Sequence, residues 1–153
     1  TKAYQYLMPE IATTKVSKGE NYKGLPYVVL DYKANYTKSN IFAFRTLFWW
    51  GNFFSFSLHL QGTYLETFRS KLLANSTNLK ATDFYICIYE SPWQYDFTEY
   101  NYTKISDLDE HELRELLRSK PFIKIAYKIN LDEFNRINEI GVSTFEKMLC
   151  LLR

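Results

Sequence analysis

Two aromatic-rich segments separated by a glycine–asparagine pair constrain this chain more than any other feature. Ile41–Trp50 and Phe53–Leu60 are both rich in large apolar residues, and Gly51-Asn52 lies between them. A two-residue type II′ turn prefers glycine at its first position, because glycine tolerates a positive φ there. The sequence therefore predicts a central antiparallel hairpin in which Trp50 pairs with Phe53.

The whole chain is also rich in aromatic residues. Among 153 residues there are 13 Tyr, 12 Phe and 3 Trp, which together make up 18% of the chain. Aromatic side chains bury large areas, and Tyr and Trp keep a polar end that can stay in water. So many of them predict either a heavily aromatic core or aromatic surface that is left over for recognition. A chain of this length most naturally forms one domain, so we expect residues 1–153 to be a single domain.

The remaining pattern predicts an α+β fold: a mainly antiparallel sheet of about five strands with helices mostly on one face. Further strands are expected at Tyr27–Tyr32, Asp83–Glu90 and Phe122–Asn130. In the last of these, alternation places Lys124 and Lys128 on a solvent-exposed side. Helices are expected from Pro9 to Lys18, from Thr63 to Ala74, between Ser106 and Pro121, and on either side of Gly141.

The predicted hairpin pairing gives one of its faces a polar strip. Thr46, Ser55, Ser57 and His59 lie along that face among aromatic rings. Ser55, Ser57 and His59 share a face in any register, because side chains alternate along a strand. Hydroxyls and an imidazole between aromatic walls are typical of a small-molecule pocket, although Ser and Thr are also common on a solvated sheet face.

The opposite face of the predicted hairpin is apolar except for Arg45. An arginine among apolar side chains requires a carboxylate or an anionic ligand, or else must reach the margin of the sheet. We therefore expect either an internal ion pair, a side chain that extends to water, or an anion site.

Residues 91–103 form a second unusual segment, in which five aromatic residues are mixed with polar ones. Trp93 and Tyr95 are the candidate binding residues here. The segment is interpreted either as a lid whose rings stack on a sugar or a base, or as a structural element. That element would be a twisted edge strand or a loop fixed over the core by those rings.

Composition disfavours several classes of function. The net charge is only +2 and the charges are interleaved, so a nucleic-acid partner is disfavoured. Two histidines and two cysteines are too few for an ordinary zinc site, and no glycine-rich phosphate-binding motif occurs, so we expect no metal and no cofactor. No apolar run approaches the roughly 20 residues that cross a bilayer, which predicts no membrane partner. Cys87 and Cys150 are expected to be buried thiols, as in a cytoplasmic protein.

Three functions are put forward as hypotheses. The first is a non-enzymatic binding or interaction module, cytoplasmic and bacterial, whose aromatic sheet face binds a small ligand or a second copy of the chain. The alternative is an enzyme of undefined class that uses His59 and neighbouring hydroxyls beneath the 91–103 segment. The third is a single-stranded nucleic-acid binder that stacks bases on its rings.

Overall fold

The computed structural model describes residues 12–34 and 37–153. Within these ranges the strands are β1 (Ala12–Tyr22), β2 (Leu25–Ala34), β3 (Ile41–Trp49), β4 (Phe53–Gln61), β5 (Tyr85–Cys87), β6 (Tyr102–Lys104) and β7 (Phe122–Ile129). The helices are α2 (Thr63–Ala74), α3 (Ser76–Lys80), α4 (Glu110–Ser119) and α5 (Ile137–Cys150), with short 3₁₀ turns at Ile105–Asp107 and Leu131–Arg136.

The strands form one sheet in the order β1-β2-β3-β4-β7-β5-β6, and each described pair is antiparallel. The predicted α+β fold with an antiparallel sheet is therefore confirmed, and the sheet is larger than the five strands expected. Among the described residues, none of the helices is long and apolar enough to cross a membrane.

The central hairpin is present, but its register differs from the predicted one by one residue. Trp49 rather than Trp50 pairs with Phe53, and the turn contains three residues, with Gly51 at φ +71°. This register places Phe42, Phe44 and Phe48 of β3 on the same face as Phe54, Phe56 and Leu58 of β4. Burial of aromatic surface outweighs the preference for a two-residue turn, because each buried aromatic ring contributes about 2–3 kcal/mol.

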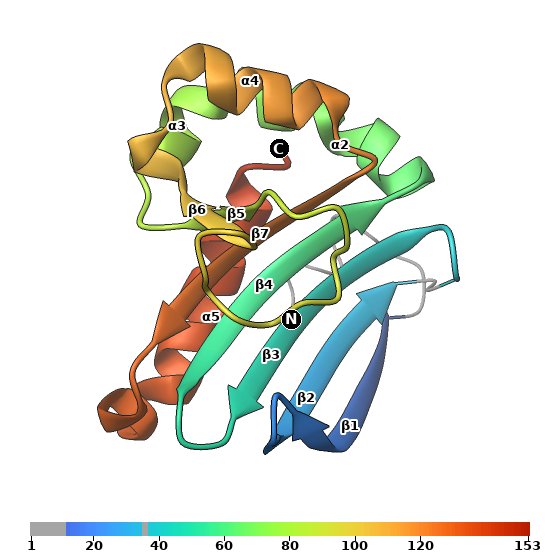
Figure 1. The fold of residues 1–153 in the computed structure, drawn as a ribbon. Coiled ribbons are helices and arrows are strands. Elements are labelled where there is room, and N and C mark those ends of the chain that lie inside the picture. The colour runs from blue at the N-terminus through green and yellow to red at the C-terminus, as the bar shows by residue number, and fades with distance from the viewer. Residues whose placement is uncertain (1–11, 35–36) are drawn as a thin grey trace.

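One face of the sheet, called the helix face below, carries the main core. Its core side chains on β3, β4 and β7 are Phe42, Phe44, Phe54, Phe56, Leu58, Leu60, Ile123, Ile125 and Ile129. Helices α2, α4 and α5 contribute Leu65, Leu113 and Met148 to the same cluster. Figure 1 shows α5 running behind the sheet along β4 and β7, with α2, α3 and α4 gathered at one end.

The other face is covered by a loop rather than by a helix. Residues 88–101, called the strap below, connect β5 to β6 and cross in front of β4 and β3 (Figure 1). We call the surface beneath it the strap face. Of the predicted strand Asp83–Glu90, only Tyr85–Cys87 is strand, because the chain leaves the sheet at Ile88 to enter the strap.

Two predicted helical regions are also corrected. The helix expected from Pro9 to Lys18 is strand β1 from Ala12 onward, and its first three residues lie outside the described ranges. Pairing with β2 along this strand outweighs the weak local preference for helix. At the other end, α5 continues through Gly141 instead of stopping there. A Cβ at this position would lie 2.8 Å from the ring of Phe56, so glycine allows the helix to approach the sheet.

Candidate functional site

The shifted register redistributes the predicted site residues between the two faces. Ser55, Ser57 and His59 share the strap face as expected, but their companion from β3 is Arg45, which pairs with Ser57. Thr46 pairs with Phe56 and lies on the helix face, so its predicted place beside Ser57 and His59 is wrong. The polar strip therefore contains a cation in place of a hydroxyl.

Arg45 forms an internal ion pair with Asp31, the neighbouring residue on β2. Its Nε and Nη2 donate to Asp31 Oδ1 and Oδ2 at 2.6 and 2.8 Å, and Nη1 donates to the hydroxyl of Tyr95 at 3.3 Å. The guanidinium carbon lies 5.8 Å from the ring centroids of both Trp93 and Tyr95. Of the three outcomes expected for Arg45, the bidentate ion pair is therefore observed.

His59 is buried beneath the strap and held by neutral groups. Its Nε2 lies 3.1 Å from Gln61 Oε1, and its ring meets those of Trp93 and Phe122 edge to face at 5.4 and 5.9 Å. Burial, and then the charge of Lys124, lower the pKa of His59 to about 3. The imidazole is therefore neutral at physiological pH and a weak proton acceptor.

Lys124 of β7 pairs with His59 and is 3% exposed, which overturns the prediction that it faces solvent. Its ammonium group donates to the backbone carbonyls of Pro92 and Gln94, at 2.7 and 3.2 Å. Burial lowers the pKa of Lys124 to about 7. The strap buries Lys124, and the hydrogen bonds from Lys124 in turn hold the strap in place.

A second set of contacts fixes the strap to the β1–β2 hairpin. The hydroxyl of Tyr22 donates to Asp96 and accepts from the backbone N–H of Tyr95 at 2.9 Å, and Lys23 pairs with Asp96 at 3.0 Å. Burial alone would raise the pKa of Asp96, but hydrogen bonds from Tyr22, Lys23 and Thr98 lower it to about 2. Of the interpretations of residues 91–103, these contacts match the loop fixed over the core for the strap, whereas Tyr102 and Thr103 belong to the edge strand β6.

We call Asp31, Arg45, Ser57, His59 and Lys124 the polar cluster. Its members come from four strands. All of them except Asp31 line a void of about 10 Å³ beneath the strap, which is close to the smallest space that holds one water molecule. Trp93 closes this void from the outside and is 42% exposed. In this conformation the cluster has no room for an organic substrate.

The helix face contains a much larger concavity. A groove of about 720 Å³ lies between strands β2, β3 and β4 and helix α5. Phe44 and Phe56 form part of its floor, and Thr46 lies in it. At its margins Leu30 and Val142 are 40% and 58% exposed. Aromatic walls with isolated polar groups are the features expected of a small-molecule site.

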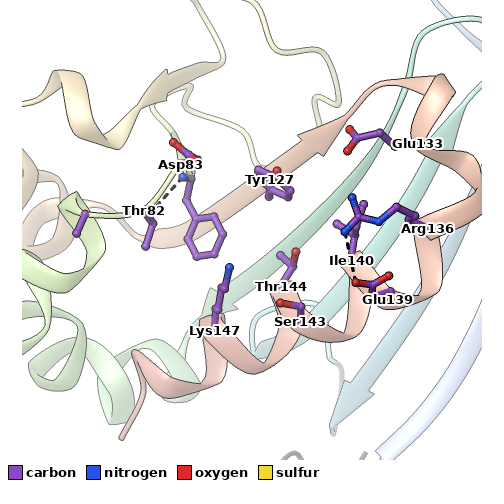
Figure 2. Close-up of a pocket in the computed structure, with 12 residues that line it drawn as sticks. Thr82, Asp83, Tyr127, Glu133, Arg136, Glu139, Ile140, Ser143, Thr144 and Lys147 are labelled. Atoms are coloured by element: carbon purple, nitrogen blue, oxygen red, sulfur yellow. Dashed lines mark hydrogen bonds and ion pairs between the residues drawn. The ribbon is translucent and has the colours of Figure 1, made fainter.

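A third concavity, of about 430 Å³, lies where α5 begins beside β7 and the segment before β5. Figure 2 shows that its rim carries charges of both signs, including Asp83, Glu133 and Lys147. Arg136 pairs with Glu139 at 3.3 Å on this rim, and both side chains are mostly in water. Exposed pairs of this kind contribute little, so this cleft is a weaker candidate.

Other expectations concern metal ions and thiols. Among the described residues there is no group of three or more His, Cys, Asp or Glu that could hold a metal ion. Cys87 is a buried thiol as predicted, whereas Cys150 is exposed, because it lies on the outer side of the last turn of α5.

Sequence reasoning missed two members of the polar cluster, Asp31 and Lys124. Asp31 stands in an apolar strand segment, and this was a usable signal, since a carboxylate there needs a partner such as Arg45. Lys124 carried no comparable signal, because the alternation of β7 is the same whether its polar side faces water or the strap.

Comparison with known proteins adds no relationship. The chain matches no protein-family model, no curated protein and no solved structure.

Proposed function

We propose that this protein is a non-enzymatic binding module whose groove on the helix face holds a small, elongated apolar molecule with a neutral or cationic polar end. The observation that supports this proposal is the groove of about 720 Å³ between β2–β4 and α5. Pockets for drug-sized ligands measure roughly 300–1,000 Å³, so its size is appropriate. The aromatic sheet face expected to bind a ligand is then the one that contains Thr46.

The chemistry of the lining determines the class of ligand. Leu30, Phe44, Phe56 and Val142 present aliphatic and aromatic carbon, which favours a chain or ring system without charges along its length. Each CH₂ group that the ligand transfers from water into the groove contributes about 0.8 kcal/mol to binding. A ligand of about ten carbons is therefore expected to bind mainly through its apolar body.

The polar groups of the groove favour one kind of head group. Glu146 is the charged residue that lines it within the described part of the chain, and Thr46 and Asn138 supply neutral hydrogen-bonding groups. A carboxylate on the ligand would approach Glu146 unfavourably, whereas an ammonium or hydroxyl group would not. We therefore expect decylamine and decanol to bind more tightly than decanoate.

The alternative enzymatic function has weaker support. It requires His59 to act beneath the strap, but the void beside His59 measures about 10 Å³. With its pKa lowered to about 3, mainly by burial, the imidazole is a poor general base at neutral pH. A cytoplasmic location remains part of the proposal, and the free thiols of Cys87 and Cys150 support it.

Calorimetric titration of the three ten-carbon compounds, each below its micelle concentration, tests the proposal. Leu30→Trp fills the groove, and we expect at least a tenfold weaker binding of decylamine, equivalent to about 1.4 kcal/mol. Val16→Trp is the matched control, since Val16 pairs with Leu30 on the same face but does not line the groove. Glu146→Gln should remove the preference for decylamine over decanoate.

Two results would contradict the proposal. One is the absence of binding by all three compounds. The other is equal binding by the Leu30→Trp and Val16→Trp variants. Light scattering during size-exclusion chromatography completes the test: a dimer that only Leu30→Trp dissociates would mean that a second copy of the chain occupies the groove.

A further inference from the structure

The void in the polar cluster is lined by positive charge that a neutral water molecule would not balance. Arg45, Lys124 and Ser57 all line it, and it measures about 10 Å³. Two cationic groups thus meet at one small buried space. This space lies on the strap face, so its occupancy is independent of the groove on the helix face.

Lys124 is the group that most requires a counter-ion. Its ammonium contacts two carbonyl oxygens, and the rings of Tyr95 and Tyr102 lie 5.6 Å from it. Within the described residues no carboxylate oxygen lies within 4.0 Å of its Nζ. A buried charge without an opposite charge is strongly unfavourable, so this group must either lose its proton or gain an anion.

Ser57 gives an independent indication of an occupant. Its side chain is buried, and its hydroxyl makes no hydrogen bond to any described residue. Buried hydroxyl groups almost always have a partner, and an exception calls for a bound water, ion or ligand. The hydroxyl lines the same void as the two cations.

We infer that the void is a binding site for one monatomic anion of the halide class, such as chloride, held by Arg45, Lys124 and the hydroxyl of Ser57. The size of the void favours a single atom over an oxyanion such as phosphate or sulfate, which has five heavy atoms. Charge favours an anion over water, because water would satisfy Ser57 but would leave the ammonium without a counter-ion.

The surroundings of Lys124 predict how binding depends on pH. The titratable and charged groups facing it from the neighbouring elements are Asp31, Arg45, His59, Cys87, Tyr95 and Tyr102. Burial keeps His59 and Cys87 neutral, since it lowers the pKa of the imidazole and raises that of the thiol. The anion therefore binds with protonated Lys124, and its affinity should fall up to tenfold per pH unit above about pH 7, where the pKa of the unliganded amine lies.

Bromide in crystals of the full chain provides a direct test. Data collected at the bromine absorption edge from crystals in sodium bromide should show an anomalous peak between Arg45, Lys124 and Ser57. The peak should be lost in Lys124→Met and retained in Lys128→Met, which removes an exposed lysine from the same face of β7. No peak in the wild-type protein, or a peak that survives Lys124→Met, would overturn the assignment.

Thermal unfolding in solution tests the site at lower anion concentration. At pH 7 and constant ionic strength, replacing sodium gluconate by up to 0.2 M sodium chloride should raise the melting temperature of the wild-type and Lys128→Met proteins. The rise should be smaller in Ser57→Ala and absent in Lys124→Met. An equal rise in all four proteins, or none in the wild type, would mean a general salt effect or binding at crystal concentration only, and either would overturn the inference.

Discussion

Replacing Asp31 by asparagine is the most direct test of the polar cluster as a determinant of stability. The carboxylate accepts two hydrogen bonds from Arg45, at 2.6 and 2.8 Å, and the two side chains are only 4% and 15% exposed. Removing one partner of a buried ion pair costs about 3–5 kcal/mol, because the other charge stays buried. The amide oxygen keeps one acceptor and Tyr95 remains in place, so we expect a loss of about 3 kcal/mol.

Urea unfolding followed by tryptophan fluorescence measures this loss as a lower midpoint at an unchanged slope. For a domain of about this size the melting temperature should fall by about 6–12 °C. Glu139→Gln is the matched control, since it breaks the Arg136–Glu139 pair, whose side chains are 61% and 72% exposed. We expect that change to have little effect on the free energy of unfolding, because water screens both charges.

A double variant separates loss of the pair from burial of an unpaired charge. Asp31→Leu combined with Arg45→Met removes both charges, and similar replacements of buried pairs are often neutral. We therefore expect it to be more stable than Asp31→Asn. If Asp31→Asn costs no more than the Glu139→Gln control, the reasoning that the pair is shielded from water is refuted.

Three further predictions concern protonation and packing. Burial lowers the pKa of His59 to about 3, whereas in the unfolded chain the imidazole takes up its proton near pH 6.5. His59 should therefore reduce the stability of the fold progressively as the pH falls below 6.5. The imidazole NMR signals should not titrate above pH 5, and a titration midpoint near 6.5 would contradict this. Burial likewise lowers the pKa of Lys124 from 10.5 to about 7, so in halide-free buffer the free energy of unfolding should rise by about 3 kcal/mol from pH 7 to 9.5, and Lys124→Met should abolish this rise in urea titrations. Gly141→Ala should destabilise the fold by about 1 kcal/mol although alanine has the better helix propensity, because the new methyl group would lie 2.8 Å from the ring of Phe56. Ser143→Ala at an exposed position of the same helix is the control. A stabilised Gly141→Ala variant would show that the ring moves freely.

Much of the central hairpin could be predicted from sequence. Its two strands, its turn residues and the shared face of Ser55, Ser57 and His59 all follow from local patterns. Its register could not be read from the turn alone. The choice between Trp49 and Trp50 as the partner of Phe53 depends on which pairing collects the apolar side chains against the helices, and that is a property of the whole fold.

The composition of the candidate sites was less predictable, because each is made by segments distant in sequence. Lys124 became a buried residue through its contacts with Pro92 and Gln94, about thirty residues earlier in the chain. The groove on the helix face likewise lies between α5 and strands β2, β3 and β4, and no pattern within a single strand reports that space.

The order of the strands has a consequence for how the chain folds. Strands β1 to β4 can pair in the order of synthesis, but β7 joins β4 only after the segment carrying α2, α3, β5, β6 and α4 has been accommodated. Contacts this distant form slowly, since the intervening chain must first be ordered. Lys124 arrives with β7, so we expect its ammonium group to be dehydrated after the transition state, and a φ-value near zero for Lys124→Met would agree. The chain would then remove this charge from water only when the carbonyl groups of the strap are available to receive it.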